Sequence, residues 1–258
     1  MSKFSTHCFR DFKRFIGELT ANAAGTYVAA YFTGENLPQS EDPWCDLAKS
    51  HGIKVDGIKT EQILKSSSRL NMVSIYSGFD LYLTSFRKEY QKLQDKDWSR
   101  EDKDSPFDEI RRNLGHKSVR TSHEVADKMI DVIDYYRLFR NSVAHPSKSN
   151  EKSATDTYKS SRASREAVAD YYGMTSAPNS PEAINFHDVK LFSRILLDLL
   201  PKFDEILDPG DDKLVTLIPL DEWALVSENR KSNARIGYLV NNYGLDRERA
   251  SQIVGSLA

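Results

Sequence analysis

The chain has 258 residues, and its contents of 39% hydrophobic and 29% charged residues are those of an ordinary soluble globular protein. Its 36 basic and 38 acidic residues give a formal net charge of −2, which argues against a generally basic nucleic-acid-binding coat, so any RNA binding needs a local patch. The two cysteines cannot form a disulfide framework or a cysteine-based zinc site, and the lack of a long apolar run or a signal peptide predicts a cytoplasmic protein that does not enter a membrane.

Two long helices are predicted in the first part of the chain. Residues 5–33 carry apolar side chains at helical spacing and end at Gly34, and residues 61–93 repeat the pattern. Residues 34–59, which hold Pro and Gly among acidic side chains, are predicted to form a loop between them. The helix at 61–93 is the natural partner of a helix that ends at His145.

A charged segment follows at residues 94–121. It is predicted to form a solvated loop with a short helix at 106–114. A second interpretation is that its basic side chains form a rim that binds RNA phosphates beside an active cleft. The candidates for that role are Arg111, Arg112, His116 and Lys117.

The next predicted helix starts at an N-cap on Ser122 and ends at His145, because Pro146 disfavours a helical conformation for the residue before it. Arg140 lies on the same stripe as the apolar residues of this helix, which are Val125, Met129, Val132, Ile133, Tyr136 and Val143. An Arg on a face that should be buried needs a partner, a second subunit or an anionic ligand. Arg140, Asn141 and His145 therefore form the candidate site.

Helix geometry limits how Arg140 and His145 could act together. Five residues at 100° each place them roughly 140° apart around one helix, whereas Asn141 and His145 share a face. One helix end therefore cannot easily close both side chains on one small group. Two copies of the helix end, facing each other across a twofold axis, would form a composite cleft, so we expect a homodimer.

The segment after the candidate site, residues 146–161, is rich in Ser, Lys and Thr and has almost no large apolar residue. Since such a composition buries little apolar surface, we expect a mobile segment beside His145. A short helix is predicted at 164–172, and a core helix at 186–207 is interrupted by Pro201.

A boundary is predicted at residues 208–212, which separate a main domain of residues 1–207 from a small appendage of residues 212–258. The run Leu214 to Leu220 is rich in β-branched residues and is the one strand candidate of the appendage. The rest reads as helices around Gly244, in the layout of either a small helical hairpin or a helix-turn-helix.

The string Arg140-Asn141-Ser142-Val143-Ala144-His145 resembles the motif of the HEPN superfamily. Ribonucleases of that family carry Arg, four to six residues and His at the end of a helix, often with Asn after the Arg. Residues 71–83 are similar to the family's partner helix, which carries an acidic or polar residue, here Asp80. The resemblance implies an all-α, HEPN-like helical bundle that cleaves RNA as a homodimer, in toxins or antiviral defence, under the control of an antitoxin or another regulatory partner protein.

The chemistry of the candidate side chains is consistent with that reaction. An imidazole exchanges protons at neutral pH, so His145 could take the 2′-hydroxyl proton or protonate the leaving 5′-oxygen, with Arg140 holding the scissile phosphate. Asn141 would fix the imidazole or cap the helix, Asp80 would orient Arg140 or His145, and Arg137 would be a second phosphate contact. No metal or cofactor is needed, and the products would be a 2′,3′-cyclic phosphate and a 5′-hydroxyl.

Three other interpretations remain open. The chain could be a non-catalytic dimer that binds a nucleotide or a partner protein, or a regulator that binds DNA through residues 229–258. The motif could also be structural, with Arg140 held by a carboxylate and His145 at the carboxyl end of its helix.

Overall fold

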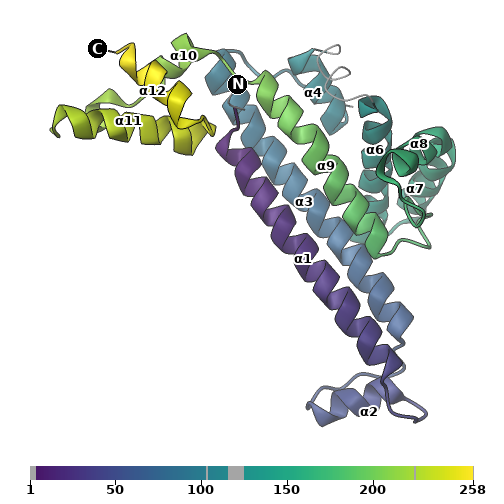
Figure 1. Cartoon of the computed structure of the whole chain (residues 1–258). Coiled ribbons are helices and arrows are strands. Elements are labelled where there is room, and N and C mark those ends of the chain that lie inside the picture. Colours follow the sequence, from purple (N-terminus) through teal and green to yellow (C-terminus); the bar gives the residue numbers. More distant parts are fainter. Residues whose placement is uncertain (1–3, 103, 116–124, 224, 258) are drawn as a thin grey trace. The chain divides into compact units, whose positions relative to one another are not determined.

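A computed structural model describes residues 4–102, 104–115, 125–223 and 225–257. Over these ranges the chain forms helices and no strand, which confirms the all-α prediction (Figure 1). The helices are α1 (His7–Glu35), α2 (Pro43–Ser50), α3 (Thr60–Gln94), α4 (Pro106–Leu114), α6 (Ala126–Ala144), α7 (Lys148–Ser160), α8 (Arg162–Tyr172), α9 (Phe186–Ile206), α10 (Asp211–Thr216), the 3₁₀ helix η1 (Leu220–Trp223), α11 (Glu228–Tyr243) and α12 (Arg247–Gly255).

The chain divides into two compact units. One contains residues 1–14, 79–126 and 197–258, and the other contains residues 15–78 and 127–196. The division crosses the boundary expected at residues 208–212, since the residues after that segment cluster with earlier parts of the chain. The candidate residues Arg140, Asn141 and His145 all lie in the unit of residues 15–78 and 127–196, which we call the motif unit.

The core of the motif unit is built from the apolar stripe of α6. Met129, Val132, Ile133 and Tyr136 are all buried, as the helical periodicity predicts. The ring of Phe192 on α9 lies 5.1 Å from that of Tyr136 and 6.5 Å from that of Tyr76 on α3. Rings from α3, α6 and α9 therefore pack together in the core of the motif unit.

A buried carboxylate anchors the start of α9 to α6. Asp188 is 0% exposed and accepts four hydrogen bonds, from the Tyr136 hydroxyl (3.0 Å), the Asn179 backbone N–H (2.8 Å), the Asn179 side-chain amide (2.8 Å) and the Asn185 backbone N–H (3.0 Å). Burial raises the pKa of Asp188, although these hydrogen bonds act in the opposite direction.

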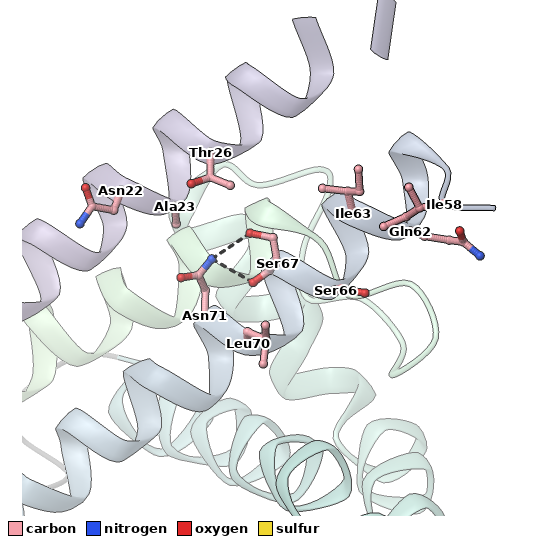
Figure 2. A pocket seen from close by; sticks show the side chains of 10 residues that line it. All are labelled: Asn22, Ala23, Thr26, Ile58, Gln62, Ile63, Ser66, Ser67, Leu70 and Asn71. Carbon is pink, nitrogen blue, oxygen red and sulfur yellow. Dashed lines mark hydrogen bonds between the residues drawn. The ribbon is translucent and has the colours of Figure 1, made fainter. Parts of the chain in front are cut away.

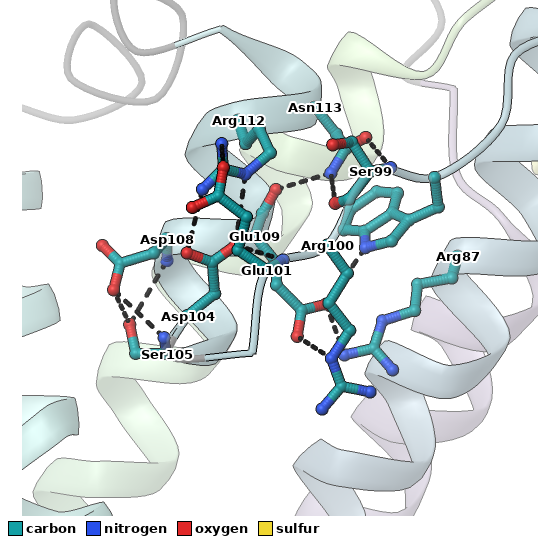
Figure 3. A network of polar contacts seen from close by, with 11 residues as sticks. Arg87, Ser99, Arg100, Glu101, Asp104, Ser105, Asp108, Glu109, Arg112 and Asn113 are labelled. Atoms are coloured by element: carbon teal, nitrogen blue, oxygen red, sulfur yellow. Dashed lines mark hydrogen bonds and ion pairs between the residues drawn. The ribbon is translucent and has the colours of Figure 1, made fainter.

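The other unit, which we call the terminal unit, has an aromatic core and a buried acid on α4. The rings of Phe79, Tyr82, Phe107 and Phe203 lie within about 6.5 Å of a neighbour. Glu109 is 2% exposed and binds Arg87 (2.7 Å), Arg100 (3.3 Å) and the Trp98 indole N–H (3.0 Å), as Figure 3 shows. These contacts fasten the segment between α3 and α4.

Residues 148–160 form helix α7, where we expected a mobile segment without regular structure over 146–161. Ser147 caps the helix, because its side chain accepts a hydrogen bond from the Asn150 N–H. Ala154 is fully buried, and the ring of Tyr158, one turn later, lies 5.4 Å from that of Tyr135 on α6. Two side chains on one face thus attach an otherwise polar helix, which lies beside α6 (Figure 1).

The strand candidate at Leu214 to Leu220 is wrong, because the chain forms α10 and then η1 there. Gly210 supplies a positive φ of 81° at the start of α10, and Leu214 on α10 and Ile218 just beyond its end are both buried. A strand at this position would have had no partner among the residues that the structure describes, so its backbone groups would have stayed unpaired.

The last two helices form a hairpin, as both interpretations of the appendage predict. Gly244 ends α11 with a φ of 63°, and the side chain of Asp246 caps α12 by accepting a hydrogen bond from the Arg249 N–H at 2.7 Å. The guanidinium of Arg249 in turn binds Asp208 (2.6 Å) and Asp211 (2.7 Å), which ties α12 to the segment after α9.

Candidate functional site

His145 lies in the short connection between α6 and α7. Its backbone N–H continues the helix by donating to the Asn141 carbonyl at 2.9 Å, and its own carbonyl accepts a hydrogen bond from the Asn150 side chain at 2.7 Å. The backbone is therefore fixed on both sides, whereas the residue is exposed. A substrate can therefore reach His145 without any movement of the backbone. The expected N-cap Ser122 lies outside the described residues.

Arg140 is half-buried on the last turn of α6, on the apolar stripe where the sequence places it. Its ζ carbon lies 5.5 Å from the centre of the buried Tyr76 ring, and its Nη1 donates to the Asn141 side-chain oxygen at 3.2 Å. Within the described ranges Arg140 forms no ion pair, and its solvent-shielded Nε has no hydrogen-bond partner. The expected structural role, an Arg held by a carboxylate, is thus not found among these residues.

Arg69 on α3 is a residue of this region that the sequence did not single out. Its ζ carbon lies 5.6 Å from the centre of the Phe139 ring, which is fully buried next to Arg140 on α6. The contact is the counterpart of the one between Arg140 and Tyr76, since each helix contributes one Arg and one aromatic ring. The seven-residue spacing of Arg69 and Tyr76 places both on one face of α3. The contacts with α6 show that this face meets α6, which the spacing alone does not indicate.

The two supporting candidates differ in their surroundings. The Nε of Arg137 donates to the Asp134 side chain at 3.1 Å, one turn earlier on α6, so its charge is balanced within the helix. Asp80 lies on the part of α3 that belongs to the terminal unit, and its backbone carbonyl accepts a hydrogen bond from the Thr84 hydroxyl at 3.0 Å. An orienting role for Asp80 stays a prediction.

The basic candidates of the charged segment are largely balanced by acids. Arg112 forms ion pairs with Glu101 (2.6 Å) and Asp104 (2.9 Å), and its hydrogen bonds lower the pKa of Asp104 (Figure 3). Arg111 lies 3.9 Å from Asp108 on the same helix. These contacts favour the interpretation in which the segment is held by its own charges. His116 and Lys117 lie outside the described residues.

A separate groove of about 500 Å³ lies between α1 and α3 in the motif unit. Figure 2 shows its polar lining, which consists of Asn22, Thr26, Gln62, Ser66, Ser67 and Asn71. Asn71 donates to the Ser67 carbonyl at 2.9 Å, so part of this lining is satisfied within α3. None of the described residues that line the groove is titratable, and none of them belongs to the candidate site. These residues therefore offer shape and neutral hydrogen bonding but no acid–base chemistry.

Comparisons with known proteins assign no family to the chain, because no protein-family model, curated protein or solved structure matches it. In the part of the chain that the structure describes, three or more His, Cys, Asp or Glu side chains nowhere gather as a metal site would require. No helix within the described ranges combines the length and the apolar character needed to cross a membrane. The candidate function is therefore argued from the side chains at the end of α6.

Proposed function

We propose that the chain is a metal-independent endoribonuclease that acts as a homodimer, with Arg140 and His145 as its catalytic residues. The observation that carries the proposal is the state of Arg140, whose guanidinium contacts an aromatic ring and an amide but no carboxylate among the described residues. A cation held in this way can stabilise the charge of a phosphate. The exposed His145, five residues later, supplies an imidazole, the side chain that most often serves as a general acid or base.

The reaction would be an in-line transfer at phosphorus. One His145 takes the proton of the 2′-hydroxyl, the 2′-oxygen forms a bond to phosphorus, and the bond from phosphorus to the 5′-oxygen breaks. His145 of the second copy gives a proton to the leaving 5′-oxygen, so the products are a 2′,3′-cyclic phosphate and a 5′-hydroxyl. Arg140 binds the non-bridging oxygens, and Asn141, which accepts one of its N–H groups, positions the guanidinium.

The test is cleavage of single-stranded RNA in the presence of a chelator. Removing a general acid–base costs about 10²- to 10⁴-fold in rate, and losing a donor to a developing charge costs a similar factor. We therefore expect His145→Ala and Arg140→Ala to lose at least about 100-fold in rate while sedimentation still shows a dimer. DNA of the same sequence should stay intact, because it lacks the attacking 2′-hydroxyl.

A matched control is His187→Ala, since His187 is also an exposed histidine of the motif unit but lies at the start of α9. Its cleavage rate should equal that of the wild type. Cleavage that disappears with the chelator, or that survives in His145→Ala, would contradict the proposal. Saturable nucleotide binding without any turnover would instead support a non-catalytic dimer.

We also propose that the activity serves as a toxin or an antiviral defence effector that a partner protein holds in check. Expression of the wild type in a bacterial host should then arrest growth, and expression of His145→Ala should not. Equal growth with both proteins would contradict this role.

A further inference from the structure

We propose that Arg69 and Arg140 together form a phosphate-binding site on the seam between α3 and α6, and that this site binds the backbone of the RNA substrate. The inference rests on the proposed function for the identity of the ligand. It adds a residue from a second helix, 71 positions before Arg140 in the sequence, to the group that holds the substrate.

Each of the two arginines contacts an aromatic ring of the other helix. Arg69 extends from α3 to the Phe139 ring of α6 at 5.6 Å, and Arg140 extends from α6 to the Tyr76 ring of α3 at 5.5 Å. A cation–π contact with a ring uses none of the guanidinium N–H groups, so the planar fork that matches the oxygens of a phosphate stays available. The contacts therefore favour one position for each side chain without consuming the groups that would bind an anion.

The electrostatic surroundings favour an anion. Phe139 is 0% exposed and Tyr76 is 4% exposed, so each guanidinium lies against a buried ring, where water screens charge less than in bulk solvent. Within the described ranges neither Arg69 nor Arg140 forms an ion pair, whereas Arg137 and Arg162 of the same unit pair with Asp134 and Glu166. Two positive charges at one seam, without a carboxylate between them in these ranges, are compensated most directly by a phosphodiester backbone.

The site contains two cations from two helices. Arg69 and Tyr76, the ring that Arg140 contacts, are seven residues apart on α3, which places their backbones roughly 10 Å apart along the helix axis. With the scissile phosphate on Arg140, Arg69 is available to a neighbouring phosphate of the same strand. An RNA oligonucleotide should therefore bind more tightly than inorganic phosphate or a mononucleotide.

The experiment measures RNA binding separately from cleavage. In the full-length His145→Ala protein, a labelled single-stranded RNA is titrated by fluorescence anisotropy at several salt concentrations, with and without Arg69→Ala. We expect Arg69→Ala to weaken binding about tenfold, as for the loss of a charge-assisted hydrogen bond, and to reduce the magnitude of the salt slope by about 0.7. Arg69→Lys keeps the charge, so it should keep the slope and lose only part of the affinity.

Arg194→Ala is the matched control, because Arg194 stacks on Tyr172 at 4.9 Å in the same unit but on α9 and α8. It removes the same charge and should leave affinity and slope unchanged. Equal affinity for Arg69→Ala and its parent, or an equal loss in Arg194→Ala, would overturn the inference. If Arg69→Ala does not fold, a changed slope in the folded Arg69→Lys protein would overturn it as well.

The two proposals fail in different ways. Wild-type protein that binds RNA through Arg69 but never cleaves it would refute the nuclease and leave the phosphate site. If cleavage depends on His145 but Arg69→Ala changes neither the RNA affinity nor the salt slope, the nuclease would stand and the phosphate site would be refuted.

Discussion

Replacing Asp204 by Asn should stabilise the terminal unit at pH 8 and change its stability little at pH 4. Asp204 is 0% exposed and accepts two hydrogen bonds from Thr6, one from the backbone N–H at 2.5 Å and one from the hydroxyl at 2.6 Å. Burial raises its pKa to about 6, because the cost of removing the charge from water exceeds the effect of those two bonds. The wild-type carboxyl is therefore ionised at pH 8 against its surroundings.

The size of the effect follows from the change in pKa. An increase from the ordinary value of 3.8 to about 6 corresponds to about 3 kcal/mol. Since the folded-state pKa lies above the unfolded one, this contribution to stability is fully present below about pH 4 and is lost as the pH rises through about 6. Asn does not titrate, so the variant lacks this loss.

The hydrogen bonds at Asp204 can survive the substitution. The Asn oxygen can accept from the Thr6 backbone N–H, and the Asn amide can donate to the Thr6 hydroxyl, which can reverse its role. The free energy of unfolding would be measured by urea titration at pH 4 and pH 8 and monitored through tryptophan fluorescence. Trp98 and Trp223 lie in the same unit as Asp204, so their emission reports its unfolding. A difference between variant and wild type that is the same at both pH values, or a variant that is less stable at pH 8, would refute the reasoning.

Two further substitutions should destabilise the protein. Asp188→Asn should lower the free energy of unfolding of the motif unit by about 3 kcal/mol. Both carboxylate oxygens of Asp188 accept hydrogen bonds from N–H groups of Asn179 and Asn185, which can only donate. The NH₂ group of an Asn would replace one of these oxygens and place a donor against a donor. Urea titration at pH 7 checks this, and an unchanged midpoint would contradict it. Glu109→Ala should cost the terminal unit about 3 kcal/mol, since it leaves the charge of Arg87 without its carboxylate in a largely buried position. The control is Glu101→Ala, whose side chain is 66% exposed and whose melting temperature should stay within about 2 °C of that of the wild type; equal losses in both variants would argue against a special role for the buried network.

The long helices could be predicted because their signal repeats many times. In α3 and α9 apolar side chains recur at three and four residues over more than five turns, so one misleading residue does not change the pattern. The predicted helices at 61–93 and 186–207 agree with Thr60–Gln94 and Phe186–Ile206 to within one residue at each end. The short helix at 106–114 could be found as well, because Ser105, Pro106 and Asp108 form a complete start signal.

The wrong predictions, at α7 and α10, concern short elements whose sequence signal does not repeat. In α7 the buried contacts come from Ala154 and Tyr158, and an average over the thirteen residues of the helix, most of them polar, hides these two. In α10 the β-branched residues favour a strand locally, but a strand needs a partner elsewhere in the chain, and local propensity contains no information about that partner. The chain instead forms α10, which buries Leu214, and it buries Ile218 just beyond the end of that helix.

The same distinction applies to the candidate site. Arg140, Asn141 and His145 could be selected from the sequence because they share six consecutive residues at a predicted helix end. Arg69 could not, because its meaning depends on a contact with Phe139, and nothing in α3 alone indicates which face meets α6. A periodic pattern identifies the buried face of a helix but does not identify the helix that covers it.

Arg137 and Arg140 lie one turn apart on α6 and have different partners, and the sequence places Arg140 on the apolar stripe of the helix. Arg137 turns to Asp134 and becomes half of an ion pair, which is the ordinary solution. The Arg140 guanidinium contacts the Tyr76 ring and donates one hydrogen bond to the Asn141 side chain. Its hydrogen bonding is therefore only partly satisfied, and no carboxylate among the described residues balances its charge. Since an unbalanced, half-buried charge costs folding free energy, a purely structural role would be served better by a neutral side chain at this position. An anionic ligand would remove that cost when it binds, which supports the proposal that Arg140 binds the substrate.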